Sequence, residues 1–181
     1  MIDWNKYQAE ALTTAVYPLE RELDYTILGL CSEVAEVAEL AYQLDEDTSI
    51  PDWQASMKSE LGDVAWYAAA VADALSVPLQ QIADMRAATV EDTSALKALL
   101  ALVAASGALA GLLKKSIRDE GGHLSATCEY RMKVEVERVL LLLAQLCRGH
   151  HLTLEGVTQA NLNKLADRKQ RDMLGGSGDR R

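Results

Sequence analysis

Four carboxylates form two pairs that could hold a metal ion. Glu33 and Glu36 lie in LCSEVAEVAEL (30–40), and Glu60 and Asp63 lie in KSELGDVAWY (58–67). Residues three apart on a helix share one face, so if the two helices pack, the four carboxylates converge. Buried like charges repel and lose hydration unless a cation compensates them. Carboxylate oxygens suit a hard cation, so the spacing predicts a Mg²⁺ site, with Mn²⁺ as a possible substitute.

Other interpretations of the acidic residues exist. A single E-x-x-E is common by chance and usually marks a solvated helix flank, and Glu39, which continues the spacing, is expected to face solvent. A di-iron helical bundle would need Glu-x-x-His on its helices. Such a pair occurs here as Glu120 and His123, where two intervening glycines break the helix. His150 and His151 fall in an expected loop and are interpreted as polar surface.

Helical periodicity runs through the chain, and strand-like alternation of β-branched residues is absent. The three prolines fall where helices should begin or end, and residues 90–93 resemble a linker. The pattern therefore predicts an all-α fold, a helical bundle. The expected helices cover residues 3–16, 23–45, 52–76, 78–88, 94–119, 126–148 and 154–171.

The charges divide the chain into two unequal halves. Residues 1–90 carry 16 Asp and Glu against 4 Lys and Arg, whereas residues 91–181 carry 11 against 14. Eight of the nine aromatic residues precede residue 68. The helices of the second half also echo those of the first at an offset of about 75 residues, which predicts a tandem repeat. We expect an acidic half (1–90), a mildly basic half (91–171) and a disordered tail (172–181).

Composition excludes several classes of function and location. A net charge of −9 argues against nucleic-acid binding, which needs a basic surface. The leucine-rich stretch 139–146 is far shorter than the ~20 residues of a membrane span. The chain opens without a secretion signal, and its three cysteines have no metal-like spacing. We therefore expect a cytoplasmic protein with free thiols and no membrane partner.

Several segments together resemble the MazG-like, all-α nucleoside triphosphate pyrophosphohydrolases. They are YP (17–18), LGLCSEVAEVAEL (28–40), ELGDVAWYAAAVADALSVPL (60–79), LKKSIRDEGG (113–122) and ANLNKLADRK (160–169). The resemblance implies Mg²⁺-dependent hydrolysis of a (d)NTP to a (d)NMP and pyrophosphate. It also implies that Glu33, Glu36, Glu60 and Asp63 bind the metal, and we take Glu36 and Glu60 as the catalytic carboxylates.

The sequence departs from the family pattern in one informative way. In compact members the KK-x-x-R-D-x-GG stretch directly follows E-x-x-E on the same helix, whereas here it lies in the second half. Gly107 and Ala110 stand where the repeat would place Glu33 and Glu36. We therefore expect a fused, asymmetric pseudo-dimer of two MazG-like repeats, in which the acidic half holds the metal and the basic half binds phosphates.

Residues that would contact the nucleotide follow from this division. The predicted phosphate-binding residues are Lys115, Arg118, Lys164 and Arg168, because Lys and Arg neutralise phosphate charge. The predicted nucleoside contacts are Asn161, Gln8, Trp66 and Tyr67, with Trp4 and Tyr7 as further aromatic candidates. A non-catalytic helical module and a nucleotide sensor without turnover remain alternatives. A homodimer through the leucine-rich 139–146 stretch is also possible.

Overall fold

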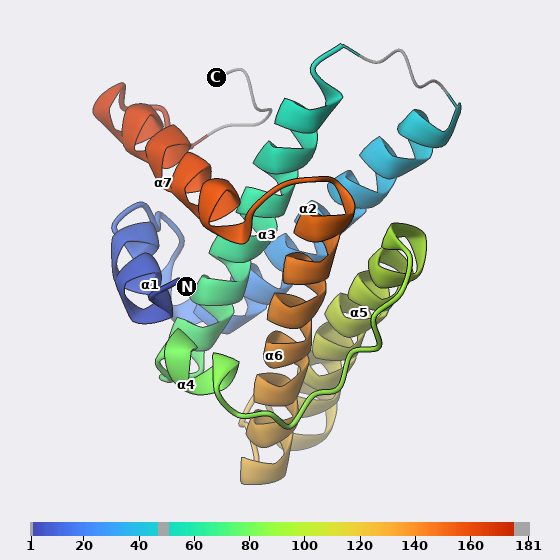
Figure 1. The fold of residues 1–181 in the computed structure, drawn as a ribbon. Helices are drawn as coiled ribbons and strands as arrows, with labels where there is room; N and C mark the ends of the chain where they lie inside the picture. Colours follow the sequence, from blue (N-terminus) through green and yellow to red (C-terminus); the bar gives the residue numbers. More distant parts are fainter. Residues whose placement is uncertain (1, 47–50, 176–181) are drawn as a thin grey trace.

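The chain is all-α in a computed structural model that describes residues 2–46 and 51–175 (Figure 1). Within these ranges there are seven α-helices, a 3₁₀ turn at Leu19–Arg21 and no strand. The all-α prediction is confirmed. The helices are α1 (Trp4–Leu12), α2 (Glu22–Glu46), α3 (Trp53–Ala74), α4 (Leu79–Ala83), α5 (Ala95–Glu120), α6 (Ala126–Gly149) and α7 (Leu154–Gln170).

Short polar side chains fix where four of the helices begin. The side chains of Asp3, Ser94, Ser125 and Thr153 each accept a hydrogen bond from the backbone N–H three residues ahead. These N-caps satisfy amides that have no intrahelical partner. At the other end of α5, Gly121 adopts a left-handed conformation with φ 62°, as its sequence position predicts.

Four long helices, α2, α3, α5 and α6, form the body of the molecule. α2 packs along α3 and α5, while α6 packs along α5 and α3 (Figure 1). The shorter helices cover this body: α1 and α7 lie on α3, and α4 lies against α1 and α6. Segments far apart in sequence therefore meet on α3, where the acidic motif ELGD lies.

Two predicted helices are shorter than expected. The first ends at Leu12, because the hydroxyls of Thr13 and Thr14 donate to backbone carbonyls three residues back and compete with the helix. The fourth ends at Ala83 instead of residue 88. Beyond it the backbone amides of Ala87 and Ala88 donate to the buried Glu137 carboxylate, at 3.0 and 2.8 Å, which holds this stretch out of a helix.

The leucine-rich 139–146 stretch belongs to the core. Leu140, Leu142, Leu143 and Leu146 are at most 4% exposed, and only Leu141, at 39%, reaches the surface substantially. The stretch is therefore not the free surface that the expectation of a homodimer through it requires. Of the predicted tail, residues 172–175 form a turn and bend after α7, and residues 176–181 lie outside the described residues.

Candidate metal centre

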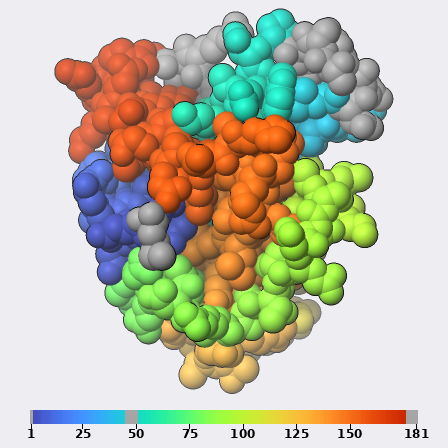
Figure 2. All heavy atoms as spheres, in the orientation of Figure 1, coloured from blue at the N-terminus to red at the C-terminus, as the bar shows by residue number. Residues whose placement is uncertain are grey.

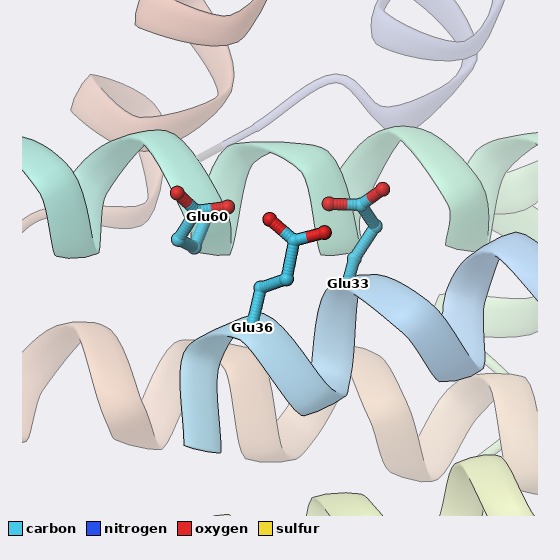
Figure 3. Close-up of side chains that lie close together, drawn as sticks. All are labelled: Glu33, Glu36 and Glu60. Atoms are coloured by element: carbon cyan, nitrogen blue, oxygen red, sulfur yellow. The ribbon is translucent and has the colours of Figure 1, made fainter. Parts of the chain in front are cut away.

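Three of the four predicted metal ligands converge. One carboxylate oxygen from each of Glu33, Glu36 and Glu60 lies within 4.8 Å of the other two. Figure 3 shows Glu33 and Glu36 rising from α2 toward Glu60 on α3. Glu33 and Glu60 are half-buried, Glu36 is exposed, and Oε2 of Glu60 is shielded from solvent.

Helix packing produces this convergence. On α2, Leu30, Val34 and Val37 are at most 1% exposed and turn into the core. Their phase leaves Glu33 and Glu36 at the edge of the buried stripe, on the side toward α3. The fully buried Leu61 and Val64 orient α3 in the same way and bring Glu60 to the facing edge.

The oxygen arrangement fits a divalent cation. Mg²⁺ binds oxygen at about 2.0–2.1 Å, so ligand atoms on opposite sides of the ion lie about 4.2 Å apart. The three carboxylate oxygens lie within 4.8 Å of one another, which is close to this separation. Of the three carboxylates, that of Glu36 is the one exposed to solvent.

Asp63 lies beside the three glutamates but is held by α7. Its Oδ1 accepts a hydrogen bond from Asn161 Nδ2 at 2.8 Å, and its Oδ2 forms an ion pair with Lys164 Nζ at 2.5 Å. Lys164 also donates to Ser59 Oγ at 2.8 Å. The side chains of Asp63 and Lys164 are only 15% and 20% exposed, so the ion pair is well shielded from water.

A buried polar chain extends from this pair to α1. The Tyr7 hydroxyl donates to Asn161 Oδ1 at 3.2 Å, and both residues are buried. Burial, and then the charge of Asp63, raise the pKa of Tyr7 well above its usual value, so its hydroxyl stays protonated. Gly62 makes room for this contact, because a Cβ there would lie 2.9 Å from the Asn161 Cβ.

An aromatic cluster borders the acidic residues. It consists of Tyr17, Tyr25, Trp66 and Tyr67, whose neighbouring ring centroids are 4.9 to 6.4 Å apart. Burial raises the pKa of Tyr67, and Tyr25 and the carboxylates of Glu33 and Asp63 raise it further. Tyr67 is thus a neutral hydroxyl beside the acidic residues. Tyr25 is 43% exposed, so its ring is open to solvent, whereas Trp66 is buried at 8%.

Two predicted nucleoside contacts hold the fold together. Gln8 Nε2 donates to the carbonyls of Ala69 and Val77, and its Oε1 accepts from the backbone of Leu79 at 2.8 Å. Trp66 Nε1 donates to Ala11 O at 3.0 Å and to Thr14 Oγ1 at 3.1 Å. Both side chains are only 8% exposed and already bonded within the chain. Their contact with a nucleotide stays a prediction.

The basic residues predicted to bind phosphate are spread over two regions. Lys164 lies next to the acidic residues, because it forms an ion pair with Asp63. Arg168 is buried one turn further along α7. Lys115 and Arg118 are exposed on α5. The Cys31 thiol meets the Ser106 carbonyl at 3.4 Å, and Lys115 lies nine residues beyond Ser106, which is about 14 Å along the helix. The α5 cations therefore lie away from the glutamates.

Three residues near the acidic cluster were not predicted. Ser59 lies one turn before Asp63, and Tyr25 and Gly29 precede Glu33 at successive intervals of four residues, so each shares a face with an acidic residue. Gly29 accommodates the Tyr67 ring, because a Cβ there would lie 2.0 Å from Tyr67 Cε1. The four-residue spacing was the available signal.

Comparison with known proteins gives one informative relationship. No protein-family model and no solved structure matches the chain. The "Gene 37 protein" of Mycobacterium phage L5 is 38% identical over 82 residues, which make up 45% of this chain and 72% of that protein. With that identity over most of the relative's length, the chain belongs to the family of the phage L5 Gene 37 protein.

Proposed function

We propose that the protein is a Mg²⁺-dependent nucleoside triphosphate pyrophosphohydrolase, which converts a (d)NTP and water to a (d)NMP and pyrophosphate. The observation that carries the proposal is the convergence of Glu33, Glu36 and Glu60 within 4.8 Å. The resemblance of the sequence motifs to those of MazG-like enzymes supports it, because that resemblance implies metal binding by these same three residues.

The metal would be held by these three glutamates. Mg²⁺ held there would neutralise phosphate charge and lower the pKa of the attacking water. Asp63 lies one turn from Glu60 and is engaged by Lys164, so we assign it to positioning α7 at the site. Tyr67 offers a neutral hydroxyl that can donate a hydrogen bond on the inner side of the cluster.

The exposed carboxylate of Glu36 is the proposed proton acceptor. Among the three glutamates it is the one that faces solvent, so it can reach a water molecule that attacks the α or β phosphorus. The oxygen–phosphorus bond to the attacking water forms, the anhydride bond breaks, and the water proton passes to a Glu36 oxygen. Glu60, with one oxygen shielded from solvent, anchors the inner side of the site.

Lys164 and the aromatic cluster provide contacts for the rest of the nucleotide. Lys164 is a positive charge beside the acidic residues, and point charges of this kind bind phosphate. Tyr25 lies eight residues before Glu33 on α2, about 12 Å away along the axis. An extended nucleoside triphosphate bridges such a distance, and its base can stack on the open Tyr25 ring.

We also propose that the chain is a fused pair of MazG-like repeats. In support, α4 follows α3 and lies against α6, while α7 follows α6 and lies against α3, an exchange expected of two related halves. Arg138 and Glu135, which the repeat aligns with Asp63 and Glu60, form an ion pair at 3.5 Å. The second half thus has a cation, Arg138, at the position where the first half has Asp63, next to the proposed metal ligand Glu60.

The test is pyrophosphate release from a panel of dNTPs and NTPs in Mg²⁺, Mn²⁺ or EDTA. We expect metal-dependent release that falls by on the order of 10²–10³-fold in Glu60→Gln. Glu39→Gln is the matched control, because Glu39 is exposed on α2 and contacts Gln43 instead of the cluster. Nucleotide binding without release from any substrate would instead identify a sensor and contradict the enzyme proposal.

A further inference from the structure

The outer faces of α2 and α5 carry an unusual number of exposed apolar side chains. Among the described residues, large hydrophobic residues more than a third exposed include six from these two helices besides Tyr25 of the aromatic cluster. They are Leu28, Tyr42, Leu96, Leu100, Val103 and Ile117. In Figure 2 the first turns of α5 (yellow-green) form the right-hand flank of the molecule. These exposed side chains do not contribute to the core of this chain, so the core does not account for their apolar character.

α5 carries two apolar stripes of coiled-coil spacing. The first, with Leu102, Ala105 and Leu109, is fully buried against the chain's own helices. The second runs through Leu96, Leu100, Val103 and Gly107, at successive intervals of four, three and four residues. Its members are exposed, at 66%, 61% and 42% for the three large side chains. This spacing is the one that pairs helices side by side.

A groove runs next to the second stripe. It has a volume of about 380 Å³ between α2 and α5, and Ala38, Ala41 and Tyr42 line one side while Leu96, Leu100 and Val103 line the other. Projecting leucines and an apolar hollow thus lie on the same face. A face with both features can be complementary to itself, as a twofold dimer requires.

We propose that a second copy of this chain covers the α2–α5 face, with the two α5 helices antiparallel about a twofold axis. No charged residue occurs on α5 between Lys97 and Lys114, so the exposed stripes of two α5 helices meet without like-charge repulsion. This 16-residue stretch is about 24 Å long and, with α2 beside it, about 20 Å wide. The pair would bury on the order of 1,000 Å², the lower bound for a specific dimer.

A lipid surface fits the same face less well. α5 is the one helix among the described residues that is long and apolar enough to cross a membrane by length and composition alone, which core helices also satisfy. Its first stripe, however, is committed to the core. A second copy presents both the projecting leucines and the complementary groove, which a lipid surface does not.

Sedimentation velocity over a concentration series tests the proposal. We expect a dimer that dissociates in the micromolar range for the wild type, and a monomer at all concentrations for Leu100→Glu. The matched control is Leu19→Glu, since Leu19 is an exposed leucine, at 79%, that lies in the 3₁₀ turn away from α5. This variant should dimerise like the wild type. Circular dichroism confirms that each variant keeps its helices.

The wild-type measurement keeps the proposal falsifiable if Leu100→Glu does not fold. A wild type that remains monomeric at several hundred micromolar overturns the proposal. So does a dimer that tolerates both Leu100→Glu and the milder Leu96→Ser. Co-flotation of a monomeric wild type with neutral phosphatidylcholine vesicles would assign the face to lipid instead. None of these readouts depends on nucleotide hydrolysis, so they are independent of the proposed enzyme activity.

Discussion

The α2–α3 pair and the α5–α6 pair are alike in build and different in chemistry. α2 and α5 have 25 and 26 residues, and α3 and α6 have 22 and 24. The two helices of each pair follow one another in the chain and pack along their length. The first pair brings Glu33, Glu36 and Glu60 together, whereas the second has Gly107 and Ala110 where the proposed repeat would place Glu33 and Glu36.

The difference shows that the scaffold and the site are separable. Apolar residues at helical spacing suffice to build either pair, and they bury the same kind of core in both. The site depends on a few polar substitutions at the edge of that core. In the second pair the edge of α5 is apolar instead. Its exposed stripe of apolar side chains can pack against another helix but offers no oxygen ligands for a cation.

Metal binding should give the largest contrast between the two pairs. Saturating Mn²⁺, at about 1,000 times its Kd, should stabilise the wild type by about 4 kcal/mol. Glu60→Gln should lose most of this gain, because it removes the partly shielded carboxylate of the cluster. Glu135→Gln, at the position on α6 that the proposed repeat aligns with Glu60, should keep it. Thermal melts with and without Mn²⁺ measure the effect, and equal loss in both variants would argue against a site on α2 and α3.

Much of the fold and part of the site could be predicted from the sequence. The second, third, fifth, sixth and seventh helices lie within about two residues of their predicted bounds, because long periodic stripes and caps are local signals. The meeting of Glu33, Glu36 and Glu60 followed from two E-x-x-(E/D) motifs on helices that pack.

The remaining features depend on contacts between distant segments. Asn161 bonds to Asp63 across 98 residues, and no local pattern predicts which helix covers α3. The shortening of the fourth helix depends on Glu137, about 50 residues away. The 139–146 leucines were ambiguous for the same reason, since an apolar run has the same pattern whether it faces the core or a partner.

Gly29→Ala should produce the next largest effect. The added Cβ would lie 2.0 Å from the Tyr67 ring, which must move away from the glutamates. Overpacking of this severity costs up to about 3 kcal/mol of unfolding free energy. Urea unfolding measures the loss, and the activity should fall as well, because Tyr67 lies beside Glu33. A stability equal to that of the wild type would show that the ring is free to shift.

Removing the cation from each of two ion pairs should separate a shielded pair from a more exposed one. Lys164→Met leaves the Asp63 carboxylate, 15% exposed, without its ion-pair partner and should cost about 2 kcal/mol. Arg138→Met breaks a 3.5 Å pair in which the arginine is 34% exposed, and should cost at most about 1 kcal/mol. Both changes are read from urea unfolding at pH 7. A larger loss in Arg138→Met would mean that the Arg138–Glu135 pair contributes more to stability than the Lys164–Asp63 pair.

The smallest expected effect has the opposite sign. A Cβ at Gly111, in the interior of α5, meets no atom within 4 Å, in contrast to one at Gly29. Gly111→Ala should therefore stabilise the protein by about 0.5–1 kcal/mol through helix propensity alone. Urea unfolding at submicromolar concentration, where the proposed dimer is dissociated, measures the gain for the monomer. A gain at submicromolar concentration that turns into a loss at high concentration would mean that a second copy approaches α5 at Gly111. The apolar face of α5 would then be a specific binding surface, as the acidic edge of α2 and α3 is proposed to be.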